Sequence, residues 1–486
     1  MKNIYSNNNK VLKETLAMFK PTEILYSPIE IGKFNHKSCI TNFFGDIIIK
    51  PFEFPNNSCG LNLFMEKFKS AVSSTSAKKI ILGCESTGHY HLNLIHNLKL
   101  FNLPVEIINP RDSKTENTNK NSKTDIIDLN AIARVLISNK GSRQIVPEGV
   151  YYNLQRATRT RFKFIHNKTS TSNIITGLVD RIFPGLWDKD NSIFSQRFSK
   201  ASLLILQHFP HPHQIIKLGT KRLANFLSKH NTKLGIDTAK QIVDTAKISL
   251  TKPVSELEQD ISALHHHLKC FHLYTQIIND LDNEIASLLI QTPGTYLLSV
   301  DGVSVTYAAY FTAEVGDINR FTYANQIISF AGTCSRKFQT AEFEAQNLRI
   351  SRKGSKFLRS TINQLALALN TWSPKFRDYY TKKYLENPEK PGRARIATGN
   401  KFVKVAFALM KQEQLFKPIG LSFDEKIYYN KLWDKIIRKL SKFNVSNVIS
   451  ENNYLIKIKK QIENNYGLSL TTEIMDGKGY CHKTCG

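Results

Sequence analysis

The sequence predicts an α/β domain near the N-terminus that is followed by a longer, mainly helical region. Three observations support this prediction. Short apolar runs alternate with helix-patterned stretches between residue 24 and about residue 137. From about residue 150 onward, apolar residues recur almost throughout at helical spacing. The chain has 486 residues, which is too long for one ordinary domain and implies two to four structural units.

The N-terminal pattern predicts the element order βββαβαβα. Polar and proline-containing breaks separate the elements, and residues 111–122 are expected to form a polar, basic loop. Strands that are joined through helices are parallel, so we expect a mostly parallel sheet beside an antiparallel hairpin pair. The expected strands are 24–31, 36–42, 46–50, 79–85 and 105–108, and the expected helices are 60–72, 89–101 and one that begins at 125.

Four acidic residues stand at the boundaries of these elements. Glu30 lies on the first strand, and Glu85 ends the fourth. Asp125 and Asp128 lie one turn apart at the start of the last helix. Sites in open α/β sheets gather at the carboxyl ends of strands, where four carboxylates would hold two divalent cations such as Mg²⁺ against a phosphodiester. For the two aspartates alone, helix capping and the helix dipole are the simpler explanation.

Residues 151–290 are expected to form a basic helical region. Arg156, Arg159 and Lys163 recur at i, i+3 and i+7 and would share one helix face, which either contacts phosphate or is simply solvated. Between 254 and 290 the apolar residues approach heptad spacing. This spacing predicts a coiled-coil-like helix, and such helices usually separate or dimerise domains.

The C-terminal region contains two further patterns. Residues 297–304 join two helical segments through a turn with Gly302, which is typical of a helix-hairpin-helix. A hydroxyl-rich loop, residues 329–343, leads to a strongly basic segment. The cationic residues of that segment are Arg349, Arg352, Lys353, Lys356 and Arg359. The expected domains are a polar extension (1–22), the α/β domain (23–150), the basic helical region (151–290), the C-terminal domain (291–415) and a basic tail (416–486).

The charge balance indicates a nucleic-acid-binding protein. The chain has 67 Lys and Arg against 40 Asp and Glu, a net charge of +27 that is spread along its whole length. Seven cysteines without a pairing pattern suggest a reducing cytoplasm. Cys481 and Cys485 lack a second ligand pair nearby, so they are interpreted as part of the tail. A signal peptide and a run of eighteen apolar residues are both missing from the sequence, so we expect no role for a membrane.

Several motifs, taken together and in order, resemble the IS110 family of bacterial insertion-sequence transposases, also called DEDD or Piv-type. The resemblance extends over roughly residues 24–415. Its N-terminal motifs are Ile29-Glu30-Ile31-Gly32-Lys33, Glu85-Ser86-Thr87-Gly88-His89-Tyr90, Asn109-Pro110 and Lys123-Thr124-Asp125 with Asp128. Its C-terminal motifs are Val300-Asp301-Gly302-Val303, Glu314-Val315-Gly316-Asp317, Phe330-Ala331-Gly332, Ile350-Ser351-Arg352-Lys353-Gly354 and Leu358-Arg359.

The resemblance implies a RuvC-like, RNase H-type nuclease domain, a coiled-coil linker and a helical transposase domain that carries a nucleophilic serine. It also implies dimers that assemble into tetramers, and a non-coding bridge RNA that selects donor and target DNA. Strand exchange would run through a covalent phosphoserine, with Mg²⁺ at the acidic tetrad. The side-chain hydroxyl attacks a phosphodiester and later passes it to a new 3′ hydroxyl. The implied location is the bacterial cytoplasm, at the nucleoid.

Two catalytic positions depart from the family pattern. Glu30 stands where the family has an aspartate, which keeps the charge but moves the carboxylate outward by on the order of 1.5 Å. Thr340 follows Phe338-Gln339 where the family has its serine, and its hydroxyl is on a more hindered, β-branched side chain. Ser335 is an alternative nucleophile. The other three tetrad positions match by identity as Glu85, Asp125 and Asp128.

Three functions are compatible with these features. An RNA-guided DNA transposase or recombinase would use all of them. A decayed or repurposed derivative would bind RNA or DNA tightly and with salt sensitivity, but would not cleave it. A RuvC-type junction nuclease would need the carboxylates but not Thr340, and it would leave residues 291–415 without a role.

Overall fold

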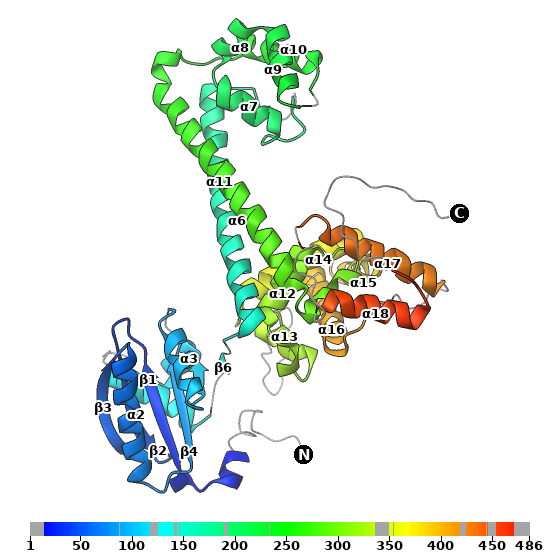
Figure 1. Cartoon of the computed structure of the whole chain (residues 1–486). Helices are drawn as coiled ribbons and strands as arrows, with labels where there is room; N and C mark the ends of the chain where they lie inside the picture. The colour runs from blue at the N-terminus through cyan, green and yellow to red at the C-terminus, as the bar shows by residue number, and fades with distance from the viewer. Residues whose placement is uncertain are drawn as a thin grey trace. The chain divides into compact units, whose positions relative to one another are not determined.

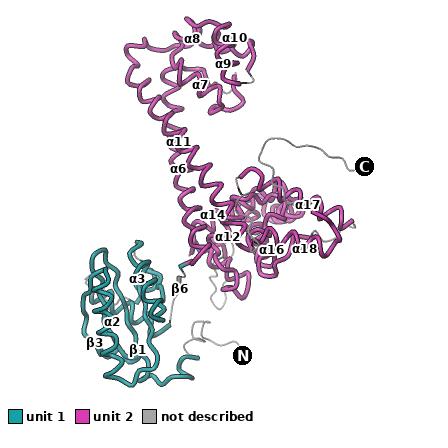
Figure 2. The backbone as a smooth tube through the Cα atoms, in the orientation of Figure 1, with its two compact units in different colours: residues 1–146 teal, residues 147–486 magenta. Residues whose placement is uncertain are grey.

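A six-stranded mixed sheet forms the centre of the first of two compact units, Met1–Val146 (Figures 1 and 2). In this computed structural model the strand order is β3-β2-β1-β4-β5-β6. The pairs β1–β4 and β4–β5 are parallel, and the other neighbours are antiparallel. This sheet with flanking helices confirms the RuvC-like, RNase H-type architecture. The strands are β1 (Ile24–Glu30), β2 (Asn35–Asn42), β3 (Ile47–Pro55), β4 (Lys79–Glu85), β5 (Val105–Ile108) and β6 (Arg143–Gln144).

The structure describes most of the chain, with gaps. The described residues are 14–86, 88–116, 125–139, 143–144, 146–188, 193–232, 234–335, 349–352, 354–417, 424–443, 445 and 453–470, with only the backbone described at 125, 143 and 144.

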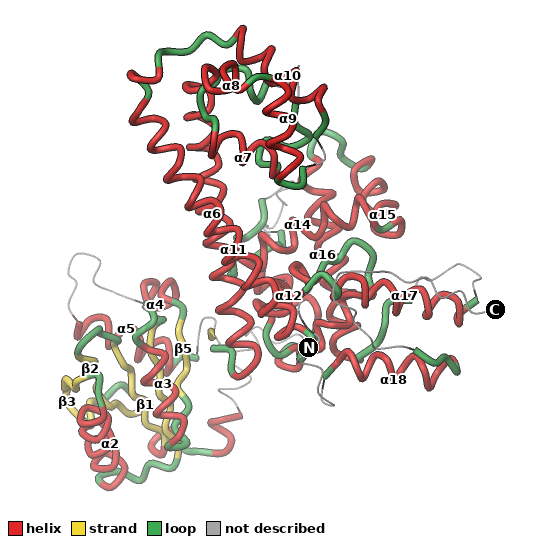
Figure 3. The backbone as a smooth tube through the Cα atoms, turned by 45° about the horizontal axis from the view of Figure 1, so that its top comes forward, coloured by secondary structure: helices red, strands yellow, loops and turns green. Residues whose placement is uncertain are grey.

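The two faces of the sheet pack against different helices (Figure 3). Ile29 of β1 and Leu82 of β4 belong to the core under α2 and α3. Ile24 and Tyr26 of β1 belong to the core under α5 on the other face. Successive side chains of a strand point to opposite faces, so a strand covered on both sides is apolar almost throughout. The helices are α2 (Ser58–Ser73), α3 (His91–Leu100), α4 (Pro110–Glu116) and α5 (Asp125–Ile137).

The sequence prediction for this unit differs from the structure at three places, the first of which is strand β3, because it continues to Pro55 beyond the expected end at residue 50. The loop expected over 111–122 begins with helix α4, and the Asn109 side chain accepts a hydrogen bond from the backbone N–H of Arg111 at 3.1 Å. Proline is favoured in the first turn of a helix because its missing N–H would be unpaired there anyway. Strand β6 was not predicted, because two residues carry no periodic pattern.

Two long helices run antiparallel through the second unit, Pro147–Gly486 (Figure 1). They are α6 (Gly149–Ile182) and α11 (Glu258–Leu289). Arg161 pairs with Asp282 at 2.6 Å near one end, and Arg181 pairs with Asp260 at 2.9 Å near the other. This arrangement confirms the coiled-coil-like helix expected over 254–290, and its partner in this structure is α6 of the same chain.

Each end of the helix pair belongs to a separate hydrophobic core. At one end, Ile182 of α6 and Leu264 of α11 pack with α7 to α10. At the other end, Leu154 of α6 and Ile285 of α11 pack with the C-terminal helices. The first group comprises α7 (Lys200–His208), α8 (Pro212–Leu218), α9 (Thr220–Lys229) and α10 (Ile236–Ile248). The second comprises η3 (Pro293–Ser299), α12 (Val305–Val315), η4 (Ile318–Arg320), α13 (Ala324–Ala331), α14 (Lys356–Trp372), α15 (Pro374–Leu385), α16 (Pro391–Gln412), α17 (Glu425–Leu440) and α18 (Tyr454–Tyr466).

The region interpreted as a basic tail contributes two helices to this core. Trp433 of α17 and Ile458 of α18 are buried in it. Lys439 of α17 donates to the carbonyls of Leu298 at 2.7 Å and Val300 at 3.2 Å, in the turn of the expected helix-hairpin-helix. Burial lowers the pKa of Lys439 to about 8. The element before that turn is a 3₁₀ helix, η3, and the one after it is α12.

Within the described parts of the chain, we find no helix that is both long enough and apolar enough to cross a membrane.

Candidate active site

Glu30 and Glu85 lie on neighbouring parallel strands at their carboxyl ends. The register of β1 and β4 places Ile29 opposite Cys84, and each glutamate is the next residue of its strand, so continuing this register would bring their Cα atoms to about 5 Å from each other. Ile29 and Cys84 both point into the core under α2 and α3. Since side chains alternate, both glutamates point to the opposite face, which α5 covers. Both glutamates are half-buried.

Helices α5 and α4 fix the surroundings of Glu85. A Cβ atom at Gly83 would lie 2.5 Å from Leu136 of α5, so glycine lets this helix pack closely on the sheet. The hydroxyl of Ser113 on α4 is 2 % exposed and donates a hydrogen bond to Glu85 Oε1. This bond restricts the rotamers of the Glu85 carboxylate and leaves its other oxygen for a further interaction.

The two aspartates belong to the start of α5. Asp125 is its first residue, and its side chain lies outside the described part. Asp128 is half-buried. Among the described side chains, no three His, Cys, Asp or Glu groups come close enough together to hold a metal ion. The donor chemistry of the predicted set still fits Mg²⁺, because carboxylate oxygens are the protein ligands that this ion prefers.

Backbone hydrogen bonds join Ser335 of the hydroxyl-rich loop to the basic segment that follows it. Ser335 and Ile350 form an antiparallel bridge, and the N–H of Ser351 donates to the carbonyl of Cys334 at 2.9 Å. Ser335 is exposed at this bridge. Thr340 lies outside the described residues and follows Ser335 by five positions in the sequence.

Gly354 lets the basic segment approach α13. Its φ is +123°, and a Cβ atom there would lie 2.0 Å from the carbonyl oxygen of Phe330. The N–H of Ser355 donates to the same carbonyl at 3.0 Å. Only glycine combines this backbone conformation with this close approach.

A cavity of about 230 Å³ lies next to the bridge, and we call it the cationic pocket. Its lining includes Lys356, Arg359, Thr333 and Asn363. Lys356 is exposed, whereas Arg359 is half-buried and donates from Nη1 to the carbonyl of Ala331 at 2.9 Å. That bond uses one of the five N–H donors of the guanidinium. Two cations beside neutral polar side chains suit a phosphate group.

The other cationic residues that the sequence predicts to bind nucleic acid differ in their exposure to solvent. Four of them are exposed: Arg156, Lys163, Arg349 and Arg352. Lys353 lies outside the described residues. Arg159, the middle member of the predicted basic face, forms an ion pair inside the protein and is therefore not a simple surface cation.

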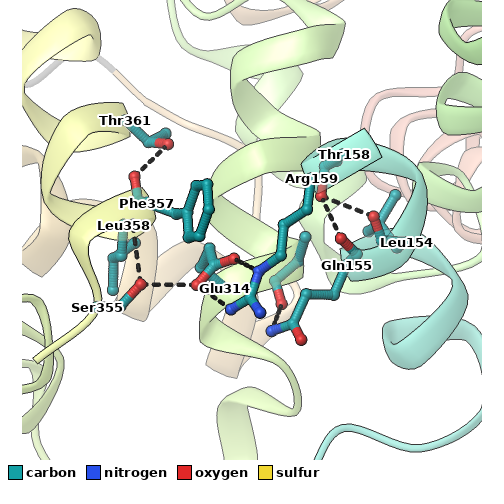
Figure 4. Close-up of polar contacts among 10 residues, drawn as sticks. Leu154, Gln155, Thr158, Arg159, Glu314, Ser355, Phe357, Leu358 and Thr361 are labelled. Atoms are coloured by element: carbon teal, nitrogen blue, oxygen red, sulfur yellow. Dashed lines mark hydrogen bonds and ion pairs between the residues drawn. The ribbon is translucent and has the colours of Figure 1, made fainter. Parts of the chain in front are cut away.

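Glu314 joins three elements in the interior of the second unit (Figure 4). Its carboxylate accepts from Arg159 Nε at 2.8 Å, from Arg159 Nη2 at 3.1 Å and from the hydroxyl of Ser355 at 2.7 Å. The Arg159 guanidinium also lies over the ring of Phe357, 4.9 Å from its centroid. The sequence analysis placed Glu314 in a family motif without assigning it a role, although a lone carboxylate in the otherwise uncharged helix Val305–Val315 signals a buried charge that needs a partner.

Two family models match the chain. A model described as a transposase, of the DEDD IS110 type, matches residues 29–184. A second, described as the transposase IS116/IS110/IS902 family, matches residues 294–381. The first match contains the four predicted acidic residues. The second contains Glu314, the bridged residues Ser335 and Ile350, and the residues of α14 that line the cationic pocket. No protein among the curated sequences matches the chain.

Together the two matches cover about half of the chain and fall in the expected order along it. The class that they define is the DNA transposases and recombinases. The chain belongs to the IS110 family, and as a transposase of an insertion sequence it binds DNA.

Proposed function

We propose that the protein breaks and rejoins DNA strands through a covalent phosphothreonine at Thr340, with the transferred phosphate bound in the cationic pocket. The observation that carries this proposal is the backbone bridge between Ser335 and Ile350. The bridge joins the residues on either side of the segment that contains Thr340, and one of them, Ile350, lines the cationic pocket. Lys356 and Arg359 in that pocket are the cations that would stabilise the phosphate.

The chemistry follows two balanced steps. The Thr340 hydroxyl loses its proton and its oxygen attacks phosphorus, so that a P–O bond to the protein forms and the bond to the 3′ oxygen breaks. The leaving 3′ oxygen takes up a proton and departs as a 3′ hydroxyl. A 3′ hydroxyl of another strand then attacks the phosphothreonine, which restores the threonine and joins the strands. Lys356 and Arg359 would stabilise the extra negative charge on the phosphate oxygens in both transition states.

Mg²⁺ is part of this proposal. Glu30, Glu85, Asp125 and Asp128 would hold it, and bound Mg²⁺ would neutralise charge on the reacting phosphodiester. The neighbouring strand ends supply two carboxylates, and Ser113 fixes the orientation of Glu85. Glutamate at position 30 keeps the charge that such a site requires.

A non-coding guide RNA and an assembly of dimers into tetramers complete the proposal. Family membership and the net charge of +27 support an RNA partner in addition to donor and target DNA. The exposed cations Arg156, Lys163, Arg349 and Arg352 are available for backbone phosphates of either nucleic acid.

The test is a search for the covalent adduct. The full-length protein is incubated with Mg²⁺, the non-coding RNA that flanks its gene and end-labelled element DNA, and the products are separated on a denaturing gel. We expect a protein–DNA adduct that is lost in Thr340→Ala and retained in Thr340→Ser and in Ser335→Ala. An adduct that survives in Thr340→Ala but disappears in Ser335→Ala would move the nucleophile to Ser335.

The same gel separates a decayed protein from an active one. Activity only in the double variant Glu30→Asp, Thr340→Ser would show that the element has lost its chemistry by these two substitutions. Salt-sensitive binding without any adduct, in the natural protein and in the double variant, would refute the enzymatic proposal and leave a binding protein.

A further inference from the structure

A second, larger cavity lies between the helices α6, α12 and α14. Its volume is about 420 Å³, which falls in the range of about 300–1,000 Å³ that is typical of small-molecule sites. Aromatic side chains from all three helices line it: Phe162 from α6, Tyr307 and Tyr310 from α12, and Phe357 from α14. We call it the stacking pocket. The rings of Phe162 and Phe357 meet edge to face, with centroids 5.5 Å apart.

The charges in the stacking pocket are already compensated. Arg159 is paired with Glu314 through two hydrogen bonds (Figure 4). Arg161 is paired with Asp282 through two hydrogen bonds, at 2.6 and 2.9 Å, and also donates to the hydroxyl of Tyr310 at 2.9 Å. These two arginines therefore leave no surplus positive charge to bind a phosphate. The aromatic side chains and polar groups of the pocket suit a flat, neutral ring instead.

Polar side chains at the mouth add hydrogen-bonding capacity. Ser360 and Gln364 of α14 line the pocket and are exposed. The amide of Gln364 offers donors and acceptors, and the hydroxyl of Ser360 can do both. Aromatic walls with a few such groups match the way proteins bind unpaired nucleobases, by stacking on the ring and by hydrogen bonds to its edge.

The stacking pocket adjoins the cationic pocket. Ser360 lines both cavities. Lys356 and Phe357 are consecutive at the start of α14, one lining each cavity, and Lys356 Nζ lies 5.3 Å from the centroid of the Phe357 ring. A nucleotide carries its phosphate and its base on one sugar, so a charged pocket beside a neutral aromatic one suits the two ends of a single nucleotide unit.

We propose that the stacking pocket holds an unpaired nucleobase of the strand whose phosphate occupies the cationic pocket. This inference rests on the proposed function, because it assumes that a nucleic-acid strand binds there. It adds that the strand is distorted at the exchange site, with one base out of the duplex stack, as in other enzymes that need access to a buried atom.

The test uses fluorescent oligonucleotides. Full-length protein is titrated with single-stranded DNA or RNA that carries one 2-aminopurine, and with the same sequence as a duplex. Stacking on an aromatic ring quenches this base, so we expect quenching with the single strand. Quenching with single-stranded DNA supports the inference. Quenching with RNA alone would overturn it, because the phosphate that the cationic pocket is proposed to bind belongs to DNA.

Substitution of Phe162 makes the test specific. Phe162 is 43 % exposed, so we expect Phe162→Ser to preserve the fold, to remove the quenching and to weaken single-strand binding roughly tenfold. Phe162→Tyr should retain both. The matched control is Ile174→Ser, on the same helix at 44 % exposure and outside the lining, which should change neither.

The outcomes separate this inference from the proposed function. The proposed role of the stacking pocket would be overturned if the protein binds DNA and forms the adduct without any quenching. It would also be overturned if Phe162→Ser leaves the quenching unchanged. In both cases the proposed function would stand. Quenching that depends on Phe162 but is never accompanied by an adduct would support the pocket and refute the chemistry of Thr340. Absence of all nucleic-acid binding would overturn both.

Discussion

Replacing Glu314 with glutamine tests how strongly its buried ion pair stabilises the second unit. The natural carboxylate is 5 % exposed and accepts three hydrogen bonds, two from Arg159 and one from Ser355. Glutamine has nearly the same size but no charge, and its amide NH₂ group can only donate. The NH₂ group would therefore face a hydrogen-bond donor of Arg159 or Ser355. The Arg159 guanidinium would also lose its counter-charge.

The expected cost is about 2 kcal/mol of unfolding free energy. Breaking a fully buried ion pair by removing one partner costs about 3–5 kcal/mol. The Arg159 side chain is 38 % exposed, so water can compensate part of its charge and we expect a cost below that range. Ser355 also accepts from the N–H of Leu358 at the start of α14, so its own cap remains.

Tryptophan fluorescence in a urea titration measures this cost. All three tryptophans, Trp187, Trp372 and Trp433, lie in the second unit, so the signal reports on that unit alone. Glu386→Gln is the matched control, because Glu386 is 51 % exposed and pairs with Lys383 on a helix surface. We expect at most about 0.5 kcal/mol from this control.

Two results would refute the reasoning. One is an effect of Glu314→Gln no larger than that of Glu386→Gln. The other comes from a double-mutant cycle with Arg159→Met: a coupling energy near zero between positions 159 and 314 would show that the pair contributes nothing by itself.

Three further predictions concern other sites. Ser113→Ala should raise the Mg²⁺ concentration for half-maximal adduct formation roughly tenfold without unfolding the protein, because Glu85 loses its orienting bond; an unchanged Mg²⁺ titration would contradict this. Gly354→Ala should cost about 2–3 kcal/mol in the urea titration, clearly more than Gly316→Ala, since both glycines have positive φ but only Gly354 faces a backbone carbonyl. For Lys439, burial lowers the folded-state pKa to about 8 against a usual 10.5, so the unfolded chain binds the proton more tightly. Stability should therefore rise with pH between 8 and 9.5, by up to about 2 kcal/mol, and Lys439→Met should abolish that rise.

The sequence alone determined the local elements and the family. Alternating and continuous apolar runs predicted the five longer strands, because the side-chain period of a strand is a local property. The motifs that contain Glu30, Glu85, Asp125 and Asp128 indicated the family, and the two family models confirm it. Strand β6 was not predicted because two residues are too few to show a pattern. Helices α17 and α18 were not predicted because they lie in a region dominated by lysine and asparagine.

Only the tertiary structure decided which side chains meet. Glu30 and Glu85 become neighbours through the parallel register of β1 and β4. Arg159, which has the spacing of a phosphate-binding face, pairs instead with Glu314, which lies 155 residues away. Periodicity shows which face of a helix a residue occupies, but whether a charge stays available for a ligand depends on its partners. Those partners come from distant parts of the chain, because a charge that folding buries must be paired.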